Sequence, residues 1–283
     1  MNILTFDIED WFHIKFDAEF TTDRNYRRFE CRLEEKLLAI LDILDEKKIE
    51  ATFLCLGWIG MRYPNLIREI DKRGHEIGSH TFLHKLVHTQ TPIEFDEDLS
   101  KSIKTLSDIT GKPVRIFRAP AFSIGPENPW AFEVLLQNGI EIDLSVFPAS
   151  RDFGGYQNFK SDSPFWIQYN GLKIKEYPIN VEYFLTKNII YSGGGYFRML
   201  PFFITQRLFQ KNNYNMAYFH ARDFDSKQPI LPNLSLMRRI KSYYGLESSW
   251  LKFEELINRN DFISVRQSEE IYDWNTAQSK TID

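Results

Sequence analysis

Cysteine is scarce in this chain, which contains only Cys31 and Cys55 among its 283 residues. No Cys-x-x-Cys pair occurs, so the sequence excludes a zinc site built on paired thiolates and a scaffold held by several disulfides. Two cysteines in a chain of this length are typical of a reduced, cytoplasmic protein. Whether these two thiols form a single bridge is left open by the sequence.

Long apolar runs are also absent, and none approaches the ~20 residues that a membrane-spanning helix requires. The most apolar segment, residues 197–209, is interrupted by Arg198, Pro201 and Arg207. It predicts a buried helix, with contact to a membrane surface as the alternative. The chain begins MNILTFDIEDW, with acids where a secretion signal has basic and then apolar residues. A cytoplasmic location is therefore expected.

An excess of positive charge is lacking as well. The chain has 35 Lys and Arg against 39 Asp and Glu, a formal net charge of -4, and its basic residues are dispersed. No nucleic-acid partner is therefore expected. Hydrophobic residues make up 43% of the chain, which is enough to build a globular core.

Short apolar segments alternate with amphipathic ones along the chain. Strands are predicted at residues 3–8, 51–57, 75–80, 114–120, 141–147, 173–180, 215–220 and 262–265, and helices at 32–48, 64–73, 92–110, 128–139, 200–212 and 236–258. This order predicts an α/β protein with a parallel sheet, open or closed, and the length suits one α/β barrel. Three consecutive glycines at 193–195 predict a loop close to a ligand or another backbone.

Polar residues capable of chemistry gather where the predicted strands end. They are Asp7, Glu9 and Asp10 after the first strand, His80 and His84 after the third, Arg118 after the fourth, Asp143 in the fifth and His220 at the end of a late one. The carboxyl ends of parallel strands carry the active sites of α/β proteins. These residues are therefore predicted to share one site.

His80 and His84, four residues apart in EIGSHTFLH, are the candidate metal ligands. Two imidazoles and one carboxylate form a set that binds zinc or another divalent ion and leaves positions open. Asp7 and Glu9 share a face if the first strand continues. Glu9 would then be the ligand and Asp7 the base that deprotonates a water. If the chain turns after Asp7, Asp10 is the competing ligand, and the sequence leaves both open.

Three further positions complete the candidate site. Arg118 beside a buried acid would keep that acid ionised and oriented. The stiff proline segment that follows would aim the Ala121 amide into the site as an oxyanion donor. His220 would protonate a leaving amine, with its ring held by Asp143 or Asp223.

Five motifs, in this order, resemble the polysaccharide deacetylases of carbohydrate esterase family four, the NodB-homology family. They are TFDIED, HTFLH, RAPAF, IDLSVFP and YFHARDFD, within residues 3–225. The resemblance implies a deacetylase barrel over residues 1–225, with residues 226–283 as a C-terminal extension that completes the same domain. GGGYFRMLP at 193–201 further resembles a bacterial subgroup associated with exopolysaccharides and surface glycans.

The family fold is a distorted (β/α)7 barrel, and the resemblance implies the same fold here. It also implies a divalent metal, zinc foremost and Co²⁺, Ni²⁺ or Mn²⁺ otherwise, bound by His80, His84 and either Glu9 or Asp10. The family's first motif commonly has adjacent aspartates, whereas Ile8 separates the acids of this chain. The identity of the carboxylate ligand is therefore the open point of the implied metal site.

The resemblance also implies a role for each remaining motif residue. Asp7, positioned by Arg118, would take a proton from the metal-bound water. The hydroxide would attack an N-acetyl carbonyl, and the metal and the Ala121 amide would hold the oxyanion. His220 would protonate the departing sugar amine, and the fourth motif, which contains Asp143, would steady its ring.

Together these features predict a metal-dependent deacetylase that acts on an acetamido sugar. The substrate would be a surface polysaccharide, or its nucleotide- or lipid-linked precursor. The alternatives are a hydrolase of cyclic amides or ureides on the same fold, and a catalytically silent carbohydrate-binding barrel. The family's usual tyrosine-glycine is Ala121–Phe122 here, so sugar contacts there are expected to differ. Arg198 and Arg222 are candidate contacts for a phosphate or carboxylate on a glycan carrier, with surface ion pairs as the simpler interpretation.

Overall fold

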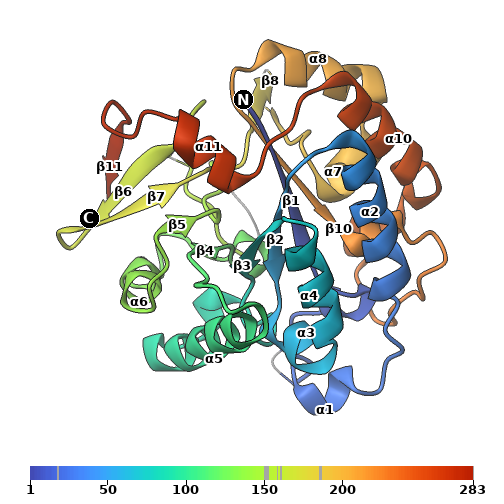
Figure 1. Cartoon of the computed structure of the whole chain (residues 1–283), viewed down its shortest axis with the longest axis horizontal. Coiled ribbons are helices and arrows are strands. Elements are labelled where there is room, and N and C mark those ends of the chain that lie inside the picture. Colours follow the sequence, from blue (N-terminus) through green and yellow to red (C-terminus); the bar gives the residue numbers. More distant parts are fainter. Residues whose placement is uncertain (18, 150–152, 158, 160, 185–186, 283) are drawn as a thin grey trace.

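A nine-stranded sheet forms the centre of the protein (Figure 1). The computed structural model describes residues 1–17, 19–149, 153–157, 159, 161–184 and 187–282. The strands of the sheet are β1 (Asn2–Ile8), β2 (Thr52–Cys55), β3 (Glu76–Ser79), β4 (Ile116–Phe117), β5 (Ile142–Asp143), β6 (Phe165–Tyr169), β7 (Leu172–Glu176), β10 (Asn215–His220) and β11 (Ser279–Thr281). A separate two-stranded sheet pairs β8 (Glu182–Phe184) with β9 (Lys187–Ile189).

The strand order across the large sheet is β10-β1-β2-β3-β4-β5-β7-β6-β11. The seven strands from β10 to β7 in this order run parallel to their neighbours, whereas β6 is antiparallel to β7. The predicted α/β class with a mostly parallel sheet is confirmed. Seven parallel strands are also the number expected of a distorted (β/α)7 barrel.

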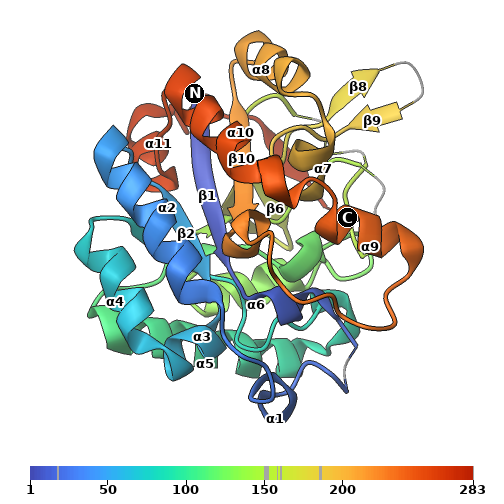
Figure 2. The same cartoon turned by 90° about the vertical axis from the view of Figure 1, so that its right-hand side faces the viewer.

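Helices follow most of the strands and cover the outside of the sheet (Figures 1 and 2). They are α1 (Asp23–Tyr26), α2 (Leu33–Lys47), α3 (Gly57–Arg62), α4 (Pro64–Lys72), α5 (Pro92–Thr110), α6 (Ala131–Gln137), α7 (Gly194–Met199), α8 (Phe202–Lys211), α9 (Leu236–Tyr243), α10 (Leu246–Arg259) and α11 (Val265–Ile271). Single 3₁₀ turns are η1 (Trp11–Ile14), η2 (Val87–Thr89), η3 (Pro120–Phe122) and η4 (Ala221–Phe224). No helix in the described ranges is long and apolar enough to cross a membrane.

The helices predicted up to residue 212 are confirmed as α2, α4, α5, α6 and α8. Local sequence sets their ends. Helix α5 begins at a capping box in which Thr91 and Glu94 satisfy each other's backbone N–H groups, and it ends at Gly111, whose φ of 70° is left-handed. Helix α4 begins at Pro64, a residue that is tolerated in the first helical turn.

Several predicted elements are wrong in extent or type, and the strand predicted at 141–147 is only β5. Residues 236–258 form two helices, α9 and α10, because Gly245 between them adopts a left-handed φ of 73° that ends the first helix. Residues 262–265 form no strand but a single bridge between Ile3 and Ile263, after which α11 begins. The strand predicted at 114–120 is only β4, and Pro120 begins the 3₁₀ turn η3.

Residues 193–195 lie against two other stretches of backbone. A side chain on Gly193 would overlap the carbonyl oxygen of Tyr218, and one on Gly195 would overlap that of Lys241. The predicted close approach to another backbone is confirmed. The predicted loop is wrong, because the last two glycines begin α7.

Strand β1 separates its side chains between two hydrophobic clusters. Leu4 and Phe6 belong to the larger cluster, and Ile3 belongs to the smaller one. Because successive side chains of a strand point to opposite faces, Thr5 and Asp7 lie on the side of Ile3. Strand β1 thus places the Asp7 carboxylate on this inner side, at the carboxyl end of the sheet.

Two buried carboxyls lie side by side on β5 and β7, where Asp143 is in register with Glu176. Ser145 Oγ donates to Asp143 Oδ1 at 2.6 Å, and the Val146 N–H donates to Glu176 Oε1 at 3.0 Å. Burial raises the pKa of Asp143 to about 6 and raises the pKa of Glu176 well above its ordinary value. Burial therefore favours the protonated form of both carboxyls over two adjacent negative charges.

Glu176→Gln should stabilise the protein at alkaline pH. The pKa of Glu176 is higher in the folded state, so the wild type loses stability as the pH rises above the unfolded carboxyl value of about 4.3. The amide of glutamine has nearly the same shape and stays neutral over this pH range. Thermal unfolding at pH 8 should give a Tm higher by ~2–4 °C, and the gain should shrink toward pH 5.

The matched control is Glu97→Gln on the exposed face of α5, which should show no pH-dependent gain. A Tm for Glu176→Gln below that of the wild type at pH 8 would contradict the raised pKa of Glu176.

Candidate metal centre and catalytic site

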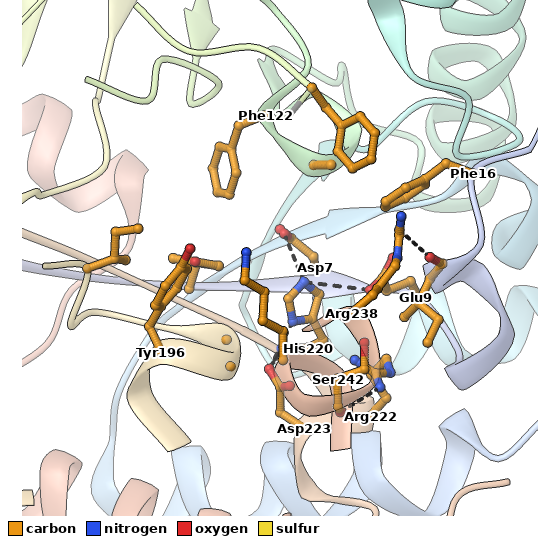
Figure 3. A pocket seen from close by; sticks show the side chains of 18 of the residues that line it. Asp7, Glu9, Phe16, Phe122, Tyr196, His220, Arg222, Asp223, Arg238 and Ser242 are labelled. Carbon is orange, nitrogen blue, oxygen red and sulfur yellow. Dashed lines mark hydrogen bonds and ion pairs between the residues drawn. The ribbon is translucent and has the colours of Figure 1, made fainter. Parts of the chain in front are cut away.

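Side chains from separate strand ends meet at one cavity of about 560 Å³ (Figure 3). Its lining includes Asp7 and Glu9 from the end of β1, His80 and His84 after β3, and His220 at the end of β10. These parallel strands are neighbours or near neighbours in the sheet, with β3 two places from β1. The structure thus brings together five of the residues singled out in the sequence.

Three buried side chains, Glu9, His80 and His84, offer ligand atoms that all lie within 4.8 Å of one another. His80 Nδ1 donates to the carbonyl oxygen of Arg118 at 2.7 Å, and His84 Nδ1 donates to that of His13 at 2.9 Å. Each hydrogen bond fixes the orientation of the ring and leaves Nε2 free to coordinate a metal, as in most metal-bound histidines. The cluster therefore has the donor types and the fixed ring orientations of a divalent-metal site.

The protonation states of the cluster also fit a metal. Burial alone would raise the pKa of Glu9, but the nearby imidazoles of His84 and His220 hold it well below the ordinary value. Burial lowers the pKa of His80 to about 4. At neutral pH the carboxylate is ionised and this imidazole is neutral, the forms in which both bind a metal. Glu9 Oε2 accepts no hydrogen bond from the described residues, although it lies 2.8 Å from His84 Nε2, and a cation would satisfy it.

Asp10 lies outside this cluster, so its prediction as the competing ligand is wrong. Its Oδ1 accepts from the N–H of Trp11 at 2.7 Å, and its Oδ2 accepts from the N–H of Arg32 at 2.8 Å. The carboxylate is the N-terminal cap of η1. The sequence alternative that the structure supports is Glu9 as the carboxylate ligand.

Asp7 is held by Arg118, whose side chain is fully buried. Arg118 Nη1 donates to Asp7 Oδ1 at 2.7 Å and to Thr5 Oγ1 at 2.9 Å. The second carboxylate oxygen of Asp7 lies 3.7 Å from His220 Nε2 at the cavity. One oxygen of Asp7 is thus anchored by a guanidinium, and the other remains available for proton transfer.

Asp223, not Asp143, holds the ring of His220. Asp223 Oδ2 accepts from His220 Nδ1 at 2.8 Å (Figure 3), and its Oδ1 is paired with Arg198. Burial alone would lower the pKa of His220, but the nearby Asp223 carboxylate outweighs this effect, and the pKa is raised to about 9. The imidazole is therefore protonated at neutral pH. Asp143 contacts Ser145 and Glu176 instead, so its role as the partner of His220 is wrong.

Arg198 and Arg222 are buried, and the prediction of surface ion pairs for them is wrong. Arg198 Nη2 donates to the carbonyl oxygen of Lys241 at 2.7 Å, and Arg222 Nη2 donates to that of Ser242 at 3.1 Å. Both guanidiniums satisfy carbonyls at the C-terminal end of α9, where a helix favours positive charge. Arg198 also forms an ion pair with Asp223.

One contributor to the site was missed from the sequence, and a second was assigned a different role. His13 supplies the carbonyl that orients His84, and a backbone contact leaves no signal in residue type. Arg198 anchors Asp223, 25 residues along the chain. The three glycines at 193–195, just before Arg198, are the sequence feature that indicates its place near the site.

Ala121 and Phe122 line the cavity after β4. Their φ values are 51° and 57°, in the left-handed region that residues with a side chain rarely adopt. Such backbone strain persists where the surrounding structure imposes it, often at functional sites. The role of the Ala121 amide as an oxyanion donor stays a prediction.

Two family models match the chain one after the other. Residues 15–139 match the model described as polysaccharide deacetylase. Residues 144–269 match a domain of unknown function, DUF3473. The two matches together span the cavity residues from His80 to His220.

Curated relatives of the chain are also sugar deacetylases. The chain is 37% identical over 83 residues to a chitooligosaccharide deacetylase of Azorhizobium caulinodans, an alignment that covers 29% of this chain and 40% of that protein. The chain spans only about 40% of the length of curated relatives such as this one.

Two solved structures share the fold over nearly the whole chain. A Mycobacterium smegmatis protein assigned to the polysaccharide deacetylases has a TM-score of 0.65 and 19% identity, over 100% of this chain and 93% of its own. A pseudoenzyme of carbohydrate esterase family four from Bacillus anthracis has a TM-score of 0.53 and 13% identity, over 99% of this chain and 66% of its own. These likenesses support the distorted barrel.

His80→Ala should remove one of the three metal ligands. We expect the affinity for Zn²⁺, measured by titration of metal-free protein, to fall by at least about a hundredfold, since three protein ligands define such a site. His88→Ala, at an exposed histidine outside the cluster, is the control and should bind like the wild type. Full metal content in the His80 variant by elemental analysis would remove His80 from the ligand set.

Asp223→Asn should lower the pKa of His220. The wild-type imidazole keeps its proton up to about pH 9 because of the Asp223 carboxylate, so its charge should be lost at lower pH without that partner. An NMR titration of the metal-free protein measures this, with the resonances assigned by comparison with His220→Gln. Asp143→Asn is the matched control, and an equal shift in both variants would contradict the assigned partner.

Proposed function

We propose that this chain, a member of the polysaccharide deacetylase family with a C-terminal DUF3473 region, is a metal-dependent hydrolase that removes the N-acetyl group from an acetamido sugar. Zinc is the proposed metal. The proposed substrate is a surface polysaccharide or its nucleotide- or lipid-linked precursor. Hydrolysis of cyclic amides or ureides on the same fold is the alternative that the substrate test below separates.

The observation that carries the proposal is a base and an acid placed close together beside a metal ligand. His220 Nε2 lies 3.7 Å from Asp7 Oδ2 and 3.6 Å from Glu9 Oε1 (Figure 3). Amide hydrolysis needs a group that removes a proton from water and a group that gives one to the amine. Asp7 and His220 supply this pair within reach of one reacting centre.

A divalent ion held by Glu9, His80 and His84 would supply a Lewis acid that polarises the amide carbonyl and acidifies a water. The chain's own residues do the rest. Arg118 donates to one oxygen of Asp7, so the other oxygen accepts the proton of the attacking water.

His220 then acts as the acid. Asp223 holds its Nδ1 and keeps the ring protonated, so that Nε2 donates a proton to the nitrogen of the departing amine. Because an amine leaves poorly without a proton, this donation allows the carbon–nitrogen bond to break. Arg198 keeps Asp223 in place from the opposite side.

A cytoplasmic substrate is part of the proposal. Cys31 and Cys55 are both free thiols, which supports a reducing compartment. A sugar linked to a nucleotide or a lipid is available there before the glycan is exported. Recognition of a saccharide unit is supported by the aromatic side chains that line the cavity from separate parts of the chain, among them Phe16, Phe122 and Tyr196.

The test is the release of acetate. Zinc-loaded protein should liberate acetate and a free amine from N-acetylated chitooligosaccharides and leave a cyclic ureide such as hydantoin intact. A chelator should stop the reaction, and added zinc should restore it. Opening of the ureide without acetate release would favour the alternative hydrolase. Metal binding without either reaction would favour a silent carbohydrate-binding barrel.

Asp7→Asn should separate catalysis from metal binding. The amide cannot accept the proton, so the rate should fall about a hundredfold or more while zinc stays bound. Asp10→Asn, three residues away, should keep both zinc and turnover and lower only the Tm, because Asp10 is a helix cap. Normal turnover of the Asp7 variant, or loss of zinc from the Asp10 variant, would overturn the assigned roles.

A further inference from the structure

Helix α9 turns its apolar side chains outward. Leu236 is 76% exposed, Met237 62%, Ile240 42% and Tyr244, which caps the helix, 60%. Leu236, Ile240 and Tyr244 are four residues apart and form one face of the helix. Single exposed apolar residues are ordinary, but adjacent ones on a short helix mark a contact surface.

The inward side of α9 is held mainly by polar contacts, and Tyr243 is its one aromatic residue that packs on the core. Ser242 is buried against the protein. Arg198 Nε donates to the carbonyl oxygen of Tyr244 at 3.0 Å, and Arg222 Nη2 donates to that of Ser242 at 3.1 Å. Hydrogen bonds thus fix the helix to the barrel, and its apolar face is left for another partner.

The segment around α9 is strongly cationic. Residues 226–246 contain Lys227, Arg238, Arg239 and Lys241 and no Asp or Glu, although the chain as a whole has a net charge of -4. Arg239 and Lys241 are exposed. At 100° per residue they flank the apolar face on its two sides.

We propose that α9 lies on an anionic lipid surface, with Leu236, Met237 and Ile240 in the headgroup boundary and its cations on the phosphates. An apolar face bordered by Lys and Arg is the pattern of helices that lie in a membrane interface. The long stems of these cations reach the headgroups while the helix axis stays parallel to the surface. A second copy of this chain fits less well, because a two-fold contact would bring two like-charged segments together.

This contact has a consequence for the cavity. Met237 and Lys241 on α9 also line it, and α9 lies at the outer edge of the molecule (Figure 2). The cavity mouth would therefore open beside the lipid headgroups, within reach of a saccharide carried on a lipid. This consequence rests on the proposed function, whereas the lipid contact itself does not.

Sedimentation with vesicles tests the contact. The full chain should bind vesicles of phosphatidylglycerol and phosphatidylethanolamine, bind phosphatidylcholine vesicles weakly, and lose most binding in 0.5 M salt, which screens the cations. Leu236→Gln with Ile240→Gln should lower the partition coefficient at least about tenfold, because each side chain loses its burial in the interface. Arg239→Gln should lower it about fivefold on anionic vesicles only.

The matched control is Leu251→Gln on α10, which removes an equally exposed leucine (67%) and should bind like the wild type. Far-UV circular dichroism and Tm verify that each variant is folded. Equal binding by the double variant and the wild type, or equal losses in the double variant and the control, would overturn the proposal. So would dimerisation in solution that the double variant abolishes, since that would assign the face to self-association.

The two proposals fail separately. Absence of vesicle binding with acetate release intact would remove only the lipid contact. Vesicle binding without any acetate release would remove the deacetylase and leave the contact standing.

Discussion

One fully buried arginine joins the parts of the site. The Arg118 guanidinium donates to Asp7 and Thr5 on β1, and its Nε donates to the carbonyl oxygen of Leu144 at 3.4 Å. Its own carbonyl oxygen accepts from His80. The same residue therefore fixes the proposed base and one proposed metal ligand, and it ties β1 to the ends of β3 and β5. Removing one partner of a buried ion pair costs about 3–5 kcal/mol, so this geometry is strongly constrained.

The opposite side of the site has its own anchor, in the region that matches DUF3473. His220, Asp223 and Arg198 all lie within residues 144–269, whereas His80 lies within 15–139 and Asp7 precedes both. Strand β10 pairs with β1, which places His220 beside Asp7. The base and ligands thus come from the N-terminal part of the chain and the proposed acid from the C-terminal part. Neither region holds the whole constellation, so the paired strands complete it.

Much of this arrangement could be predicted from the sequence, because strand–helix alternation places the carboxyl ends of parallel strands together. Asp7, Glu9, His80, His84, Arg118 and His220 all lie where that rule puts them. The wrong predictions have a common cause, because residue type does not encode the direction in which a side chain points. Asp10 and Glu9 look alike in sequence, but the chain turns so that Asp10 caps η1. Asp143 was predicted to hold His220, but strand β7 places Glu176 beside it instead. One helix was predicted where α9 and α10 lie, because Gly245 alone marks the end of the first helix in the sequence.

The central claim is that residues far apart in the chain form one divalent-metal site. Anomalous diffraction at the zinc edge, from crystals grown with zinc, tests it most directly. We expect one strong peak about 2.0–2.2 Å from His80 Nε2, His84 Nε2 and a Glu9 carboxylate oxygen, with Asp7 and His220 beside it and not bound. A peak on Asp10, or crystals with zinc in the solution and no peak between the two imidazoles, would contradict it.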